Sequence, residues 1–362
     1  MPARCIEEPH RIVIEGVPPV SYRNGRDSLV LALNAAASTF NRALSYAALK
    51  GLSGLAFRLI FHQDWHRFTP DALCGYDHTG HLLNALGVFG SVVPVDPADP
   101  ASIDASRDRI LSSLREGYPV VAMHLMDYED WGVVAGITSD DRLLCQTPHN
   151  EPDALAEHNH WPSLLLRISG EDVEPDHTAQ FINSLRIAAS LFATKRYGDY
   201  YSGRAAYRFW ITSLQDTGTF GQLEDRGEQT YEEWVQTLLR EDKDNFARDT
   251  RYTSAYLERA HVNAWRLESL IDARKAAAAY LAFQSERYTG KASTRIARAA
   301  NLYAEQAELL TSARSFVSWE WNLPSNPWTA EMRASQAQVL LSALEIETSA
   351  VNEIQIFLSK FT

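Results

Sequence analysis

The 362-residue sequence predicts an α+β fold in two parts, a mixed α/β domain over residues 1–170 and an all-helical domain over residues 171–362. The order of the apolar patterns supports this division. Apolar runs of strand length occur among helical patterns before Gly170, whereas long segments with apolar residues three and four apart fill the sequence after it. The composition, 45% hydrophobic and 22% charged, is that of a globular protein with enough apolar residues for a core.

The first part is predicted to open with a short strand and a long buried helix. The strand spans 11–17 and ends at two prolines, and the helix spans 28–49 with Asp27 as its N-cap. Residues 138–141 have turn composition between two apolar runs, which predicts a hairpin. Further helices are predicted over 81–86 and 101–116, and further strands over 91–95, 118–126, 131–137, 142–146 and 161–168.

The second part is predicted to be built of helices, and the last of them has the most regular pattern. Seven apolar residues of that helix fall on one face: Ala337, Leu340, Leu341, Leu344, Val351, Ile354 and Leu358. We expect the long helices to pack on one another and on the first domain, and a homodimer built on their surface is a further expectation. The predicted helices span 177–195, 202–215, 229–240, 252–284, 292–318 and 329–360.

The charge and the cysteines limit the classes of partner and cofactor. A formal net charge of −12 argues against a nucleic acid or an anionic membrane surface as partner, because both require clustered Lys and Arg. Three widely spaced cysteines without a CxxC pair predict reduced thiols in the cytoplasm and no zinc site. Residues 1–10 lack the apolar core of a signal peptide, and the longest uncharged stretch, 79–95, contains glycines and a proline, so no spanning helix is expected.

Cofactor motifs are also missing from the sequence. It contains no P-loop, no GxGxxG, no nucleophile elbow and no kinase motif set, so no cofactor is predicted. The histidine pairs His62/His66 and His78/His81 have the spacing of metal ligands on a helix. The surrounding residues have loop composition, however, and we predict no metal site.

The order of the elements resembles that of papain-like folds. These proteins have an early buried helix that begins with a nucleophilic Cys, whose thiol pKa is lowered by the positive end of the helix. A His on a strand more than a hundred residues later is the base, and an Asn or Asp orients it. In this chain the helix predicted over 28–49 and the strand predicted over 131–137 would hold these two positions.

Specific stretches carry a closer resemblance, which extends along nearly the whole chain. The segments GLSGLAFRLIF, DWHRFTPDALCGYD, EGYPVVA with WGVVAGI, RLLCQTPHN and YYSGRAAYRFWITSL resemble a bacterial family related to the butirosin-biosynthesis H protein. The resemblance implies a C39-peptidase-like, papain-like N-terminal domain and a helical C-terminal domain. It also implies cysteine-dependent acyl transfer, in which an aminoacyl unit passes from an acyl carrier protein thioester to an amine.

The chain departs from the family pattern at the catalytic positions. Asp27-Ser28 stand where the Cys should begin the helix, and Asp130-Trp131 stand where the strand should carry His. His149-Asn150, after the LLCQTP strand, stand at the third position. A serine hydroxyl can replace a thiol only beside a strong base, and the expected base is missing.

Three readings follow for the function. The favoured reading is a degenerate papain-like protein that binds a small-molecule amine or a peptide, or that serves in assembly. The alternative is an acyltransferase or amide hydrolase with relocated groups, in which Ser28 or Cys74 is the nucleophile and His124, His149 or a loop histidine is the base. In the third reading the ancestry is wrong and the function is something else.

Two groups of residues are candidates for binding the ligand. Asp127, Glu129 and Asp130 form an acidic cluster that would suit a polycationic amine, although a solvated turn is the simpler explanation. Trp65 and Trp131 are flanked by polar residues, and amphipathic rings at loop edges often line ligand sites. Either ring can instead fill the core.

Overall fold

The computed structural model describes most of the chain and confirms the broad α+β fold. It is 55% helical and 16% strand, with a curled antiparallel sheet and a helical C-terminal region. The described residues are 3–67, 70–125, 130–151, 154–171, 175–224, 227–230, 233–234, 236–238, 240, 254–317 and 328–361.

The chain divides into two compact units, and neither is continuous in sequence. The first unit consists of Met1–Ser53 and His78–Phe181, and the second of Gly54–Asp77 and Ile182–Thr362. The segment Gly54–Asp77 therefore belongs to the second unit although it lies early in the sequence. The domain boundary predicted near residue 170 stays a prediction, because compact units and domains are defined by different criteria.

An antiparallel sheet forms the centre of the first unit. The strand order is β1-β2-β6-β5-β9-β4, with β7 paired to β6 and β8 paired to β7. Strand β6 has several partners because its first half pairs with β5 and its second half with β2. The strands are β1 (Cys5–Glu8), β2 (Arg11–Ile14), β4 (Val88–Pro94), β5 (Val120–Met123), β6 (Trp131–Thr138), β7 (Leu143–Gln146), β8 (Ala156–His158) and β9 (Leu164–Glu171). The antiparallel pairing of β6 with β7 confirms the hairpin predicted at 138–141.

Helices cover the centre of this sheet, where both faces of strand β5 are buried. Ile110 and Leu114 of α4 share a core cluster with Val120, whereas the next residue, Val121, points to the opposite face and is equally buried. Helix α1 packs against β5 and β6. The helices of this unit are α1 (Ser28–Ser38), α2 (Tyr46–Leu52), α3 (Thr79–Leu86) and α4 (Pro100–Arg115), and α5 (His177–Ala193) leads from the first unit into the second.

The helix predicted over 28–49 is wrong as a single element, because the chain breaks into α1 and α2. Asn41 adopts a left-handed conformation with φ of 62°, which a continuing helix does not allow. The Asn34 amide holds the returning chain: its Nδ2 donates to the Leu44 carbonyl at 2.8 Å, and its Oδ1 accepts from the Leu44 N–H at 2.9 Å. Ser45 then caps α2 by accepting from the Ala48 N–H at 3.2 Å.

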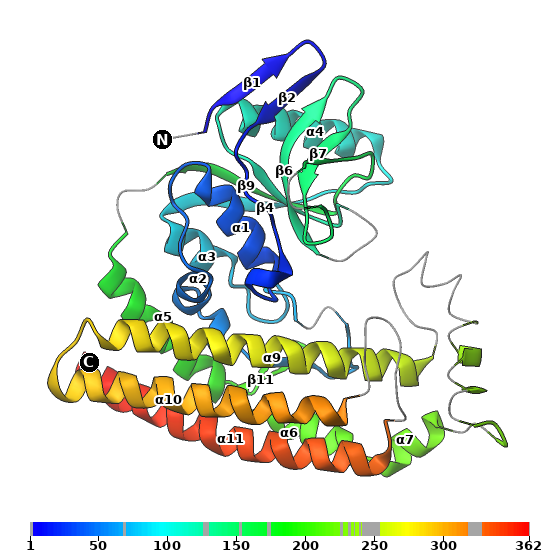
Figure 1. The fold of residues 1–362 in the computed structure, drawn as a ribbon, viewed down its shortest axis with the longest axis vertical. Helices are drawn as coiled ribbons and strands as arrows, with labels where there is room; N and C mark the ends of the chain where they lie inside the picture. The colour runs from blue at the N-terminus through cyan, green and yellow to red at the C-terminus, as the bar shows by residue number, and fades with distance from the viewer. Residues whose placement is uncertain are drawn as a thin grey trace. The chain divides into compact units, whose positions relative to one another are not determined.

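Long helices dominate the second unit. Helices α9 (Ala255–Ser285), α10 (Gly290–Ser312) and α11 (Ala330–Leu358) run side by side, and α6 (Gly203–Leu214) packs on α11 (Figure 1). A small sheet of order β10-β11-β3 accompanies them, and its strands are β3 (Ile60–His62), β10 (Arg196–Tyr197) and β11 (Tyr200–Ser202). Among the described residues, none of the helices has the length and apolar character needed to cross a membrane.

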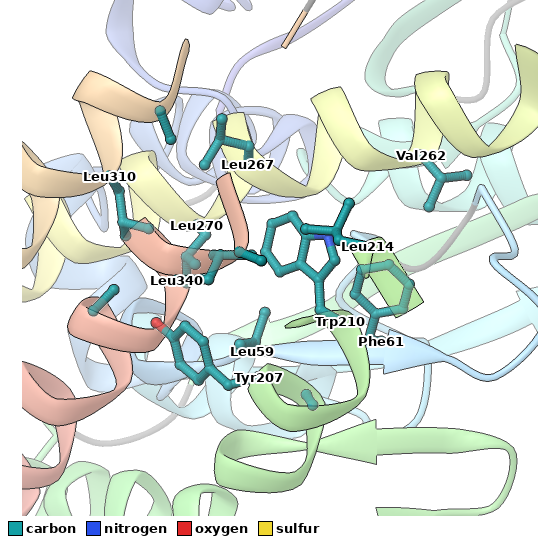
Figure 2. Close-up of a cluster of buried hydrophobic side chains, with 14 of the residues drawn as sticks. Leu59, Phe61, Tyr207, Trp210, Leu214, Val262, Leu267, Leu270, Leu310 and Leu340 are labelled. Atoms are coloured by element: carbon teal, nitrogen blue, oxygen red, sulfur yellow. The ribbon is translucent and has the colours of Figure 1, made fainter. Parts of the chain in front are cut away.

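The core of the second unit gathers side chains from each of these helices. Figure 2 shows the Trp210 indole of α6 among leucines of the neighbouring elements, including Leu267 and Leu340. The Trp210 Nε1–H donates to Asn263 Oδ1 at 2.8 Å, so the polar atom of this buried ring is satisfied. In the apolar face predicted for α11, Leu358 is half-buried and Leu341 is 41% exposed, whereas the other five residues are buried. The helix predicted at 229–240 lies partly outside the described residues.

Candidate functional site

Asp27 caps the N-terminus of α1, as the sequence predicts. Asp27 Oδ1 accepts from the Val30 N–H at 3.2 Å, and Oδ2 lies 3.7 Å from Nζ of the buried Lys50. The Tyr46 hydroxyl accepts from the Asp27 N–H at 3.1 Å and from Nζ of Lys50 at 3.2 Å. Because a cap and an ion pair hold this carboxylate, it is poorly placed to act as a base for the adjacent serine.

Ser28 is the first residue of α1 and faces the start of strand β6. Its Oγ accepts a hydrogen bond from the Trp131 N–H at 3.2 Å. Its hydroxyl also contacts the phenol of Tyr22. In the described part of the chain, the hydrogen bonds found for the Ser28 hydroxyl thus lead to a backbone amide and a phenol.

Tyr22 connects Ser28 to the acidic position before β6. It begins the short 3-10 helix η1 (Tyr22–Asn24), and its hydroxyl donates a short hydrogen bond to Asp130 Oδ1. Burial, and then the negative charge of Asp130, raise the pKa of Tyr22 well above its ordinary value. The phenol therefore keeps its proton at neutral pH and cannot deprotonate Ser28.

His149 approaches the same carboxylate from the loop after β7. Its Nε2 lies 2.7 Å from Asp130 Oδ2, and the Tyr22 and His149 rings meet edge-to-face with centroids 5.9 Å apart. A tight turn positions this histidine. The Thr147 N–H donates to Asn150 Oδ1 at 2.7 Å, and the His149 N–H donates to Thr147 Oγ1 at 3.3 Å.

The four side chains of Tyr22, Ser28, Asp130 and His149 lie together, and we call them the polar cluster. Hydrogen bonds link Tyr22 and His149 to Asp130, and the Trp131 N–H, next to Asp130 in the chain, donates to Ser28. The cluster is partly open, since the Asp130 and His149 side chains are 12% and 20% exposed. It lies where the sequence predicted a site, at the start of α1 and β6.

His124, the predicted base, has another hydrogen-bond partner nearby. Its backbone is left-handed, with φ of 63°, and its N–H donates to the Asp130 carbonyl at 3.2 Å. Its ring Nδ1 lies 2.5 Å from Ser163 Oγ. His124 thus supports the backbone of Asp130, while its ring interacts with the segment before β9.

Cys74, the other predicted nucleophile, belongs to the second unit, whereas the polar cluster belongs to the first. Its carbonyl accepts from an Arg58 guanidinium nitrogen at 2.9 Å. Burial raises the pKa of the Cys74 thiol, and a hydrogen bond with Tyr200 opposes this effect only in part. The thiol is therefore mostly protonated at neutral pH, which makes it a weak nucleophile.

The remaining predicted ligand-binding residues fall into two groups. Trp65 and Trp131 are 2% and 1% exposed, Trp65 within the core of the second unit and Trp131 within the first unit. Asp127 and Glu129 lie outside the described residues. Asp130 is thus the member of the predicted acidic cluster that the structure places in a site.

The histidine pairs noted in the sequence belong to the described part of the chain. There, no group of three or more His, Cys, Asp or Glu side chains is arranged to hold a metal ion. The His62 and His66 rings lie 5.4 Å apart, and His62 also packs against Tyr200.

Tyr22 is the site residue that the sequence analysis missed. It lies in the SYRNGRD segment, which has loop composition and no pattern that marks a buried phenol. Its proximity to Asp130 depends on a pairing 108 residues apart in sequence, which local periodicity cannot show. The chain matches no protein-family model and no curated protein, so the resemblance to the butirosin-biosynthesis H-like family stays a prediction.

Proposed function

We propose that the protein is a degenerate papain-like protein that binds a small-molecule amine or a peptide amine at the polar cluster. The observation that carries the proposal is that Ser28 Oγ accepts from the Trp131 N–H at 3.2 Å, while the nearby Tyr22 hydroxyl donates to Asp130. A phenol with a raised pKa cannot take the serine proton, so the group at the start of α1 is not arranged as an activated nucleophile.

The same geometry suits recognition of a cation. A carboxylate can accept about four hydrogen bonds, and Asp130 already accepts one at each oxygen, from Tyr22 and His149. Further acceptor capacity is therefore left for an ammonium group. The two partners also fix the carboxylate before the ligand arrives, which reduces the ordering cost of binding.

Calorimetry with spermidine, putrescine and a short peptide with a free N-terminus tests this proposal. We expect Asp130→Asn to weaken amine binding by about tenfold or more, because a charge-assisted contact contributes about 1.5–3 kcal/mol. Asp104→Asn on the exposed surface of α4 removes an equal charge and should leave the affinity unchanged. The proposal fails if none of the three amines binds, or if Asp130→Asn binds them as tightly as the unaltered protein.

The second candidate function is acyl transfer from a carrier-protein thioester, or amide hydrolysis. The Asp130–His149 pair favours it, because a carboxylate that holds an imidazole is one part of a nucleophilic triad. In that reaction Ser28 Oγ would attack the thioester carbonyl and lose its proton to His149. The thiolate would then leave with that proton, and an amine would displace the acyl group from the serine ester.

Mass spectrometry after incubation with acyl thioesters distinguishes the two functions. A binding protein gives no covalent adduct, whereas the acyl-transfer reading requires a mass increase equal to the acyl group. That increase should disappear in Ser28→Ala and persist in Cys74→Ala if Ser28 is the nucleophile. An adduct with this pattern would replace the binding proposal by the enzymatic one.

A further inference from the structure

The second unit contains a cavity that has no part in the proposed amine site. It has a volume of about 650 Å³ and lies between the end of α5, the start of α6, strand β11 and the later part of α11. This volume falls within the roughly 300–1,000 Å³ that is typical of small-molecule sites. Every residue that lines it belongs to the second unit.

Three cationic side chains line the cavity, which is open to solvent, and all three residues are exposed: Lys195, Arg204 and Arg208. None of the described residues that line it is acidic, and none of the three cations forms an ion pair within the described part of the chain. In a protein with a net charge of −12, such a local excess of positive charge is unusual. It produces a positive potential that attracts an anionic group.

Aromatic side chains form the apolar wall of the same cavity. Tyr201 and Phe209 are stacked, with ring centroids 4.5 Å apart. The Arg204 guanidinium lies 5.0 Å from the centroid of the Phe192 ring. The walls are thus already packed without a ligand, and Arg204 is held beside them through a cation–π contact.

The start of α6 adds to the positive potential. Ser202, the residue before this helix, donates its hydroxyl to the Leu191 carbonyl at 2.8 Å and makes no capping hydrogen bond to the first turn. The N–H of Gly203, the first residue of the helix, donates to the Leu59 carbonyl at 2.8 Å, and the positive end of the helix dipole lies beside Arg204 and Ala205, which line the cavity. The Leu191 carbonyl lies near the negative end of α5 and accepts this hydrogen bond from Ser202.

We propose that this cavity binds an amphiphilic anion, a carboxylate or phosphate joined to an apolar chain. The head group lies among Lys195, Arg204 and Arg208, and the chain lies against Phe192, Tyr201 and Phe209. The concentrated positive charge would bind the anionic head group, and the aromatic wall would contact the apolar chain. A cationic or uncharged molecule of the same shape would contact the aromatic wall but would have no favourable electrostatic interaction with the three cations.

Calorimetry on the full-length Asp130→Asn variant, in which the proposed amine site is impaired, tests the proposal with four probes of equal chain length: octanoate, octyl phosphate, octylamine and octanol. We expect the two anions to bind and the amine and alcohol to bind at least about tenfold more weakly. The ratio of octanoate to octyl phosphate identifies the preferred head group. Shortening octanoate to hexanoate should weaken binding by up to about fourfold for each buried methylene. Equal affinity for octylamine and octanoate would overturn the proposal.

A matched pair of double variants locates the site. Arg204→Gln with Arg208→Gln should weaken octanoate binding by about tenfold or more, because two cations next to the head group are lost. Lys275→Gln with Lys291→Gln removes the same charge from exposed positions of the second unit and should leave the affinity unchanged. Equal losses in both pairs would show a general charge effect and overturn the assignment. Asp130→Asn should not alter octanoate binding, which separates this site from the amine site.

Discussion

Each unit of the molecule contains a carboxylate paired with a nitrogen-containing side chain, but the two carboxylates differ in their surroundings. In the second unit, Glu347 and its partner Arg274 are 1% and 0% exposed. In the first unit, Asp130 and His149 are 12% and 20% exposed. The first pair is thus enclosed by protein on every side, and the second remains open to solvent.

The Glu347 pair is held by several long helices at once. Arg274 of α9 donates to both Glu347 oxygens, at 2.6 and 2.8 Å, and Gln306 of α10 donates to Oε2 at 3.1 Å. Arg274 also donates to the Ala56 carbonyl at 2.9 Å. One guanidinium nitrogen thus contacts both carboxylate oxygens, and these bonds together offset part of the loss of water around the buried charges.

The Asp130 pair is held by loops and element ends. Tyr22 comes from a 3-10 turn and His149 from a four-residue turn, and Asp130 precedes the first residue of β6. Side chains at such positions are more accessible to a ligand than side chains between packed helices. The comparison indicates that similar chemical groups stabilise the fold in the second unit and offer a binding site in the first.

The largest expected effect comes from breaking the enclosed pair. Glu347→Gln leaves the Arg274 charge buried without a full counter-charge, so we expect the free energy of unfolding to fall by about 3–5 kcal/mol. Urea denaturation followed by circular dichroism measures this change. Glu345→Gln, at an exposed position on the same helix, should change stability by less than about 0.5 kcal/mol. A loss below about 1 kcal/mol for Glu347→Gln would remove the contrast between the two pairs.

A smaller effect is expected at the open pair. Asp130→Asn should lower the free energy of unfolding by about 1–2 kcal/mol, because water can replace part of what the carboxylate provided. The pKa of Tyr22 should fall in this variant, since the adjacent negative charge is lost, yet burial should keep it above the ordinary value. Carbon-13 tyrosine NMR measures the pKa, with Tyr22→Phe to assign the signal. An unchanged or higher pKa of Tyr22 in this variant would contradict the contact between Tyr22 and Asp130.

The raised pKa of Tyr22 also predicts how stability depends on pH. Above the ordinary tyrosine pKa of about 10, the unfolded chain loses the phenol proton while the folded chain retains it. The contribution of Tyr22 to stability is therefore complete below that pH and is lost as the pH rises through the folded value. Tyr22→Phe should flatten this part of the stability curve relative to the unaltered protein.

The smallest loss of stability is expected at an exposed ion pair, with which the losses at the Glu347 and Asp130 pairs can be compared. Arg314 donates to both oxygens of Glu268 at 2.6 Å, but the two side chains are 46% and 38% exposed. Glu268→Gln should lower stability by about 0–1 kcal/mol, and added salt should reduce the difference. Thermal unfolding at two salt concentrations measures it. A loss as large as that of Glu347→Gln would mean that burial does not control these energies.

The long helices could be predicted from the sequence because their apolar pattern repeats over many turns. The range 252–284 was predicted for α9 and 329–360 for α11, and each agrees with the structure to within a few residues. The break between α1 and α2 could not be predicted, because it depends on a side-chain bond from Asn34 to Leu44 rather than on Gly or Pro. The two-residue strand β10 is too short to show a period.

The sequence could predict where two residues of the candidate site lie, but not which side chains contact one another there. The order of strand, helix and later strands placed Ser28 and Asp130 near one another, and the structure connects them. It does so through Tyr22, and His149 joins them at a turn. These contacts depend on how distant loops meet, which is determined by the whole fold and not by any local pattern.

The early position of residues 54–77 in the sequence has a consequence for synthesis and for dissection of the protein. Strand β3 pairs with β11, and Leu59 and Phe61 share a core with Trp210, so this segment has its partners far downstream. During translation it leaves the ribosome long before they exist, and its apolar strand must remain unpaired until then. A fragment that begins at residue 171 would lack β3 and leave β11 as an open edge, which favours aggregation. The helical region should therefore be expressed together with residues 54–77.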